Sequence, residues 1–202
     1  MPGICFSSAG SGSYLGGPRA ASTSASIRVR AGASDPDGDH VDGPDEAAHV
    51  LLMYGDYECP YTRAAHVALR ALQQRQARAG TPTFRYVFRH FPLREIHPHA
   101  QAAAEAAEAA QAQGRFWAMH DQLFGHQQAL DDDDLRRHAE AVGLDIARFD
   151  RDMEGFVHAA RVQRDVQRGL ADGARGTPTL LVDGAPYHGD RTSTALAAVL
   201  AG

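Results

Sequence analysis

Cys59 is the residue in this sequence that is best placed to do chemistry. It follows an apolar run that ends at Tyr54, and it precedes Pro60, which fits the first turn of a helix. At such a junction, unpaired backbone N–H groups and the helix dipole favour the thiolate over the thiol, and the thiolate is the nucleophile. The position therefore predicts a reactive cysteine, with a small hydrophobic residue in the core as the alternative.

The number of cysteines excludes a fold held together by disulfides. The chain has two, Cys5 and Cys59. Cys5 lies in a segment rich in Ser, Gly and Ala that has no apolar periodicity, so we do not expect this segment to fold. We therefore interpret Cys59 as a free thiol.

The segments around Cys59 follow an α/β pattern. Residues 49–54 predict a strand buried on both faces, the residues after Pro60 have helical apolar spacing, and residues 83–89 alternate as a second strand. A strand, a helix and a strand in this order predict a right-handed parallel crossover. Residues 179–188 then predict a hairpin around Asp183-Gly184, in which Pro186 marks an edge strand, and a last helix begins near Thr192 or Ser193.

Residues between about 97 and 174 predict almost continuous helix. In the Ala-rich part we expect Ala to face the core, and Glu and Gln to keep to the other face. Val162, Val166 and Leu170 mark the apolar face of the last long helix. The acidic run at residues 131–134 is interpreted as the N-terminal cap of a helix and not as a metal site.

The histidines do not predict a metal site. His90, His97 and His99 are close in sequence, but their spacing matches no zinc motif and prolines constrain the loop between them. His66 lies nearly two helical turns from Cys59, which is too far for direct base catalysis.

Composition and charge indicate one domain and limit its partners. We expect residues 1–38 to be a disordered low-complexity tail and residues 39–202 to be a single domain. The formal net charge is −5, and no segment collects arginine without nearby acids, which argues against nucleic acid as a partner. No apolar run is long enough to span a membrane. The tail shares its composition with organellar transit peptides, but plain disorder or a mis-set start codon is the preferred interpretation, and without a visible signal peptide the expected compartment is the cytoplasm.

These features together resemble the DsbA-like branch of the thioredoxin superfamily, and they are similar to domains fused to some bacterial sodium/proton antiporters. The resemblance rests on Cys-Pro-Tyr-Thr at residues 59–62, Phe-Arg-His-Phe-Pro-Leu at 88–93, His-Pro-His-Ala at 97–100 and Gly-Thr-Pro-Thr at 176–179. It implies a thioredoxin fold with a helical insertion, at about residues 97–174, between its βαβ and ββα halves. It also implies that Cys59, Pro60, Tyr61 and Thr62 form the catalytic motif. A cis Pro178 would then present the Thr177 backbone to Cys59 and to a bound peptide.

Thr62 departs from the Cys-Pro-x-Cys pattern of this family. Without a second cysteine the site cannot form an internal disulfide, so Cys59 would act as a monothiol on protein or small-molecule disulfides. The Thr62 hydroxyl either hydrogen-bonds the thiolate or is an ordinary polar group of the first turn. No cofactor is expected, apart from glutathione or another small thiol as co-substrate. The alternatives are a glutathione-type thiol transferase or isomerase, and a redox-silent peptide-binding module; the oligomeric state is open.

Overall fold

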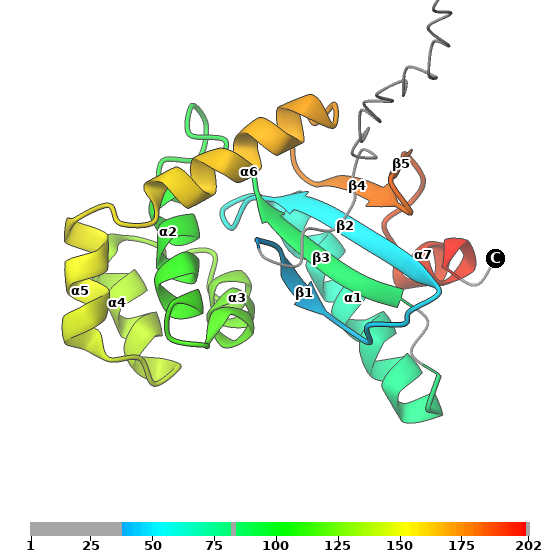
Figure 1. Cartoon of the computed structure of the whole chain (residues 1–202), viewed down its shortest axis with the longest axis horizontal. Coiled ribbons are helices and arrows are strands. Elements are labelled where there is room, and N and C mark those ends of the chain that lie inside the picture. The colour runs from blue at the N-terminus through cyan, green and yellow to red at the C-terminus, as the bar shows by residue number, and fades with distance from the viewer. Residues whose placement is uncertain (1–37, 82–83, 201–202) are drawn as a thin grey trace, which may run out of the picture.

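A mixed five-stranded sheet organises the chain (Figure 1). The computed structural model describes residues 38–81 and 84–200. Its strands are β1 (His40–Asp42), β2 (His49–Gly55), β3 (Phe84–His90), β4 (Thr179–Val182) and β5 (Ala185–Tyr187). Its helices are α1 (Pro60–Ala79), α2 (Ala100–Gln111), α3 (Phe116–Gly125), α4 (Asp132–Ala141), α5 (Ile146–Glu154), α6 (Ala159–Ala171) and α7 (Ser193–Val199). Residues 1–37 of the predicted tail, which include Cys5, lie outside the described residues.

The sheet has the strand order β1-β3-β2-β4-β5. β2 and β3 are parallel and are joined through α1, as the sequence predicts. β4 pairs antiparallel with β2, and β5, which contains Pro186, is the edge strand of the predicted hairpin. The antiparallel strand β1 on the other edge was not predicted, because three residues are too few to show a period. The thioredoxin fold with a helical insertion is confirmed.

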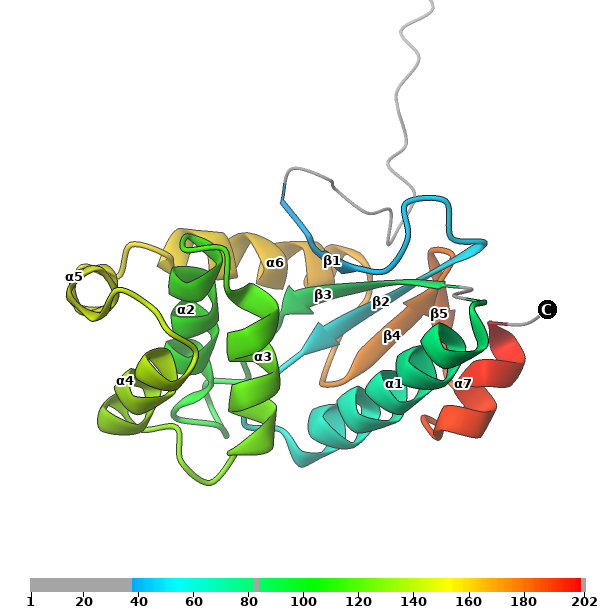
Figure 2. The ribbon, with the colours of Figure 1, turned by 90° about the horizontal axis from the view of Figure 1, so that it is seen from below.

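Alternate strand residues pack on opposite faces of the sheet. Leu51 and Met53 of β2 belong to the larger core, which α1 and α7 cover, whereas Leu52 and Tyr54 belong to a smaller core on the other face. Figure 2 shows α1 and α7 together beneath the sheet. This alternation explains why residues 50–54 form an unbroken apolar run, since a strand covered on both faces needs apolar residues at every position.

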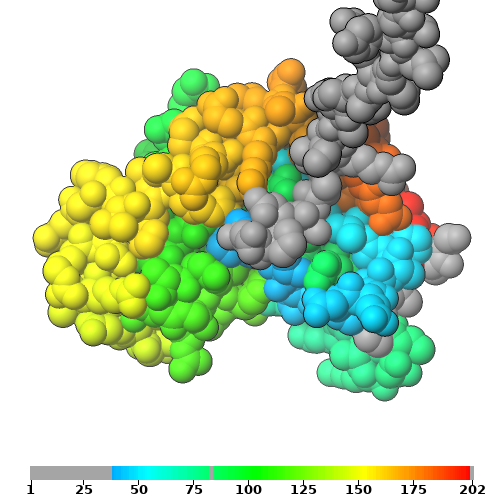
Figure 3. Space-filling view, in the orientation of Figure 1, coloured from blue at the N-terminus to red at the C-terminus, as the bar shows by residue number. Residues whose placement is uncertain are grey.

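The helices α2 to α6 form the insertion between β3 and β4. The space-filling view in Figure 3 shows α4 and α5 as a lobe at one end of the molecule. Helix α2 lies at the centre of the insertion, packed against α3, α4, α5 and α6. In the part of the chain with defined structure, no helix is both long and apolar enough to cross a bilayer.

Two expectations about the insertion are wrong. Glu105 and Glu108 of α2 are buried, each with 4% of its surface exposed, so they do not lie on a solvated face. Helices α3, α4, α5 and α6 pack around α2, and they cover these two glutamates as well as the alanines. Leu170 is 42% exposed, because only the first part of the α6 stripe, at Val162 and Val166, packs inward.

Gly169 sets how closely α6 approaches the sheet. A Cβ atom at this position would lie 2.6 Å from Phe91 Cδ2 and 3.1 Å from Tyr54 Cδ1. Both rings belong to the smaller core, so neither can move without disturbing the packing behind it. Glycine therefore lets the helix backbone contact the aromatic rings directly.

We predict that Gly169→Ala lowers the free energy of unfolding, measured by denaturant titration. Alanine gains up to about 1 kcal/mol of helix propensity, but overpacking costs about 1–3 kcal/mol, so the balance is a loss. Gly125→Ala in α3 is the matched control, because a Cβ there meets no atom within 4 Å and should leave stability unchanged or raise it. Equal stabilisation by both substitutions would contradict the proposed close contact.

Candidate functional site

Cys59 is the N-cap residue of α1, with Pro60 in the first helical turn. Its φ of −77° and ψ of 119° are extended, so the chain turns from the end of β2 directly into the helix. The thiol donates a hydrogen bond to the carbonyl oxygen of Thr177, with Sγ and O 3.3 Å apart. Cys59 is a free thiol and 3% of its surface is exposed. The sulfur therefore lies between the helix N-terminus and the loop that precedes β4.

The loop facing Cys59 contains the predicted Thr177 and Pro178. The peptide bond between these two residues is cis. Thr179 begins β4 and pairs with Tyr54 of β2, so the loop before β4 and the turn after β2 lie at the same end of the sheet. This pairing brings two segments about 120 residues apart into contact, a distance that sequence spacing alone cannot bridge.

Tyr61 and Thr62 lie on opposite sides of the first turn of α1. Tyr61 is 71% exposed, while Thr62 is fully buried. The Thr62 hydroxyl has no hydrogen-bond partner within residues 38–81 and 84–200, and the Thr177 hydroxyl has none there either. In this arrangement the Cys59 thiol bonds the Thr177 carbonyl and not Thr62, so the two alternatives for the Thr62 hydroxyl both stay open for the thiolate.

Asp56 holds the turn before Cys59 in place, and sequence analysis missed it. Its carboxylate accepts from the backbone N–H of Glu58 and of Leu93, each at 2.8 Å, and it lies 2.8 Å from Nδ1 of His97. Asp56 is 1% exposed, so its charge is satisfied entirely by these groups. An aspartate immediately after a buried strand is the signal that could have identified it.

The insertion also contacts the turn that carries Cys59. Gln127 Nε2 donates to the carbonyl oxygens of Tyr57 and Cys59, at 2.5 and 3.1 Å. Arg63 of α1 donates through Nε to the Phe124 carbonyl oxygen at 2.9 Å. The residues after α3 are thus part of the wall of the site, although no motif in the sequence points to them.

The three histidines that lie close together in the sequence, His90, His97 and His99, make different contacts. His97 binds Asp56, and the backbone N–H of His99 donates to Glu58 at 2.8 Å, so residues 97–99 fasten the start of the insertion to the site. His90 is fully buried and lies apart from them, beside Glu108. The three histidines are therefore not gathered into one site.

A buried layer of aromatic and imidazole rings lies behind the site. The Tyr57 hydroxyl is 2.9 Å from Nδ1 of His120, and the His120 ring lies 4.9 Å from the His66 ring. Burial raises the pKa of Tyr57 and lowers the pKa of His120. Burial, followed by the charges of Arg70 and Arg63, lowers the pKa of His66 to about 3. At neutral pH these rings are uncharged. The low pKa of His66 makes it a weak proton acceptor, so it serves as packing rather than as a base for Cys59.

We predict that His66→Gln reduces the loss of stability between pH 7 and pH 4. The folded state resists protonation of His66, whereas the unfolded chain binds a proton near pH 6.5. The stability that depends on neutral His66 is therefore fully present above pH 6.5. The free energy of unfolding then falls as the pH drops toward 3, by up to about 1.4 kcal/mol per pH unit. The melting temperature of both proteins across this range measures the effect.

His188→Gln, which removes an exposed histidine, is the control and should leave the slope unchanged. His40 and His120, whose pKa values burial also lowers, keep part of the slope in every variant. An unchanged slope in His66→Gln would show that His66 is protonated in the folded protein.

The fold and the site define a class of protein. A family model described as thioredoxin matches residues 35–201, and the chain belongs to this family. A thioredoxin-like oxidoreductase from Silicibacter pomeroyi has a similar structure, with a TM-score of 0.70 and 29% identity over 83% of this chain and 92% of that one. BdbD from Bacillus subtilis has a TM-score of 0.69 and 18% identity over 82% and 92% of the two chains. Within the family, the chain has the DsbA-like form of the fold.

Curated relatives carry this domain as part of a larger protein. The Na(+)/H(+) antiporter NhaA 3 of Salinispora tropica is 45% identical over 166 residues, which are 82% of this chain and 25% of that protein. The Na(+)/H(+) antiporter NhaA 1 of Mycolicibacterium vanbaalenii is 43% identical over 159 residues, which are 77% of this chain and 25% of that protein. The chain therefore spans about a quarter of the length of these relatives.

Proposed function

We propose that the protein is a monothiol thiol–disulfide oxidoreductase that acts through Cys59. The likeness to thiol–disulfide oxidoreductases supports thiol–disulfide exchange in general. The observation that supports the monothiol form is that position 59 is a cysteine and position 62 is a threonine. Cys59 lies at the helix N-terminus against Thr177, and Thr62 fills the position from which a second sulfur would act.

The proposed reaction has two exchange steps at Cys59. The Cys59 thiolate attacks one sulfur of a protein or small-molecule disulfide, forms a mixed disulfide and releases the other sulfur as a thiolate, which takes up a proton. An external thiolate, such as that of glutathione, then attacks the substrate sulfur of the mixed disulfide and releases Cys59. Cys59 then returns to its starting state, one substrate sulfur has left as a thiol, and the other is paired with the external thiol. A second external thiol displaces this sulfur, which completes the two-electron reduction of the substrate disulfide and leaves the two external thiols joined as a disulfide.

The residues around the sulfur support each step. The N-terminus of α1 stabilises the thiolate that attacks and that later leaves. The Thr177 carbonyl oxygen accepts a hydrogen bond from the Cys59 thiol in the resting state, and an incoming chain that pairs with this backbone displaces that contact. The unpartnered Thr62 hydroxyl is available to donate to the thiolate. A reducing compartment, for which we propose the cytoplasm, keeps such a thiol free.

We predict that oxidised glutathione forms a persistent adduct on Cys59. After excess reagent is removed, intact mass should retain one glutathione on this residue until a reducing thiol is added, because no neighbouring sulfur can displace it. The measurement is made in a Cys5→Ser background, so that Cys5 neither reacts nor resolves the adduct, and Cys59→Ser is the negative control. Release of the adduct without added thiol would rule out the monothiol mechanism.

An inert Cys59 in this assay would instead favour the redox-silent module. In that case the folded protein should still bind extended peptides at the loop of Thr177 and Pro178. Tight glutathione binding without a mixed disulfide would favour the transferase or isomerase.

We predict that Thr62→Cys converts the site into a cycling dithiol. Positions 59 and 62 are three residues apart at a helix start, which places their side chains on one face. The substitution removes a buried methyl group, at a cost of about 1 kcal/mol, and also removes the unpartnered hydroxyl. The variant should release glutathione spontaneously and form an internal disulfide, which lowers the intact mass by two hydrogens.

Thr62→Ser is the matched control, because it removes the same methyl group without adding a sulfur. It should retain the adduct, as the natural protein does. Retention of the adduct by Thr62→Cys would show that position 62 does not face the Cys59 sulfur.

A further inference from the structure

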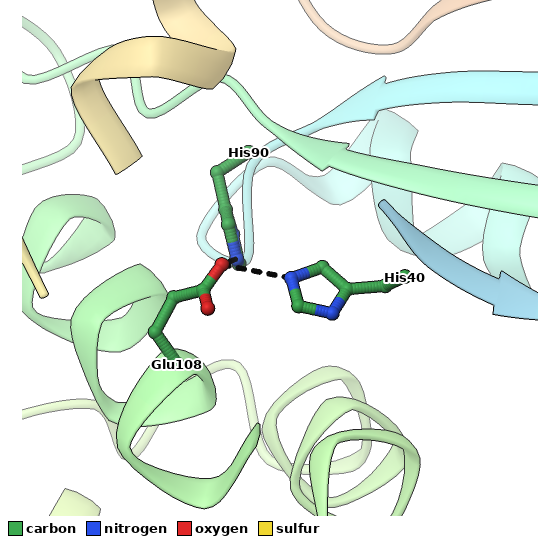
Figure 4. Close-up of side chains that lie close together, drawn as sticks. All are labelled: His40, His90 and Glu108. Atoms are coloured by element: carbon green, nitrogen blue, oxygen red, sulfur yellow. Dashed lines mark hydrogen bonds and ion pairs between the residues drawn. The ribbon is translucent and has the colours of Figure 1, made fainter. Parts of the chain in front are cut away.

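Three buried polar side chains converge where the insertion meets the sheet. His40 of β1, His90 of β3 and Glu108 of α2 point toward one another in Figure 4. Glu108 Oε1 lies 2.8 Å from His40 Nε2 and 3.1 Å from His90 Nε2. The exposed fractions of the three residues are 5%, 0% and 4%, and their potential ligand atoms all lie within 4.8 Å of one another. We call these residues the His–His–Glu cluster.

Hydrogen bonding within the protein does not satisfy this cluster. Both Nε2 atoms point at the same carboxylate oxygen, and only the bond from His40 has hydrogen-bond geometry. Neither ring nitrogen of His90 has a hydrogen-bond partner among residues 38–81 and 84–200. Nε2 of His90 has only the ion-pair contact with Glu108, and Nδ1 has no partner within these residues, so this fully buried imidazole lacks a formed hydrogen bond. Such burial is costly and leaves the ring able to bind a further group.

Two imidazole nitrogens and one carboxylate oxygen are a donor set for zinc. Zinc binds such ligands at about 2.0–2.2 Å, so the donor atoms of a tetrahedral site lie about 3.4 Å apart. The separations of 2.8 and 3.1 Å need to widen by only a few tenths of an ångström to admit the ion. The fourth position would be filled by water.

The surroundings orient the three ligands. The His40 ring is stacked on Phe116, with the ring centres 3.4 Å apart and the planes 5° apart. The backbone N–H of His90 donates to Asp165 at 3.0 Å. Arg161 makes an ion pair with Glu108 Oε1 at 3.6 Å and a closer one with Asp165 at 2.5 Å, so Asp165 is its nearer carboxylate partner. The ring stack on Phe116 and the backbone hydrogen bond to Asp165 therefore hold the two histidines in position.

Solvent can reach one member of the cluster. His40 lines a hollow of about 400 Å³ beside β1, together with Val41, Gln111 and Trp117. An ion could therefore reach the cluster from this side without the sheet opening.

We propose that the His–His–Glu cluster is a zinc-binding site that clamps β1 and β3 to the insertion. Each ligand comes from a different element, and β1 is only three residues long, so a shared ion would hold it on the sheet. The site is separate from Cys59 and does not depend on its chemistry.

A second group with potential ligand atoms fits less well. His66, His120 and Asp121 also lie close together. However, Arg70 donates to both oxygens of Asp121, at 3.0 and 2.9 Å, so this carboxylate is already bound by a cation. This group therefore provides the control.

The test is zinc binding by the full chain after treatment with a chelator, in a Cys5→Ser, Cys59→Ser background that removes both thiols. Native mass spectrometry gives the stoichiometry, and competition with a chromophoric chelator gives the affinity. We expect one zinc per chain, binding weakened at least tenfold in Glu108→Gln and in His90→Gln, and unchanged binding in His66→Gln. Circular dichroism checks that each variant is folded.

If the variants fail to fold, the Cys5→Ser, Cys59→Ser protein still tests the proposal, because X-ray absorption at the zinc edge identifies the atoms that bind the ion. Two imidazoles and oxygen ligands around one zinc support the site. No zinc binding, equal binding by Glu108→Gln, or loss of binding in His66→Gln would overturn the proposal.

Discussion

The carboxylate of Asp56 is the contact on which the geometry of the site depends. It caps the turn between β2 and α1, and at the same time it holds the backbone at Leu93 and the ring of His97. One buried charge thus joins the turn that carries Cys59 to the first residues of the insertion. Because burial of an unpaired carboxylate is so unfavourable, these bonds must form together, and they keep the helix N-terminus aimed at the sulfur.

Threonine at position 62 preserves the packing of the fold but changes the proposed chemistry. This protein needs a small side chain at position 62, because Thr62 is fully buried and its Cγ2 lies only 2.9 Å from where a Cβ on Gly55 would be. Threonine meets that need as a cysteine would, since the two are similar in size. The same replacement closes the route to an internal disulfide, so the fold is retained while the proposed reaction comes to depend on an external thiol.

The insertion is held to the sheet by polar contacts as well as by apolar packing. Glu108, His40 and His90 lie in the seam between them, and Gln127 bonds the backbone of the Cys59 turn from the far side of α3. Glu108 could not be assigned from sequence, because the spacing of glutamates in an Ala-rich helix looks the same whether one face or every face is covered. Burial of all faces of α2 is a property of the whole insertion.

Local sequence signals were enough to predict most of the elements around the site and to single out Cys59 as the candidate nucleophile. Unbroken apolar residues before Cys59, Pro60 after it and the turn at Asp183-Gly184 are local signals, and they predicted β2, α1 and the β4–β5 hairpin correctly. The family resemblance, and no local signal, placed Thr177 beside the sulfur. Only the tertiary structure placed Asp56 and Gln127 around the Cys59 turn and gathered His40, His90 and Glu108 into one cluster. The physical reason is that hydrophobic periodicity reports which face of an element is buried, whereas side-chain convergence depends on strand pairing and helix packing between residues far apart in the chain.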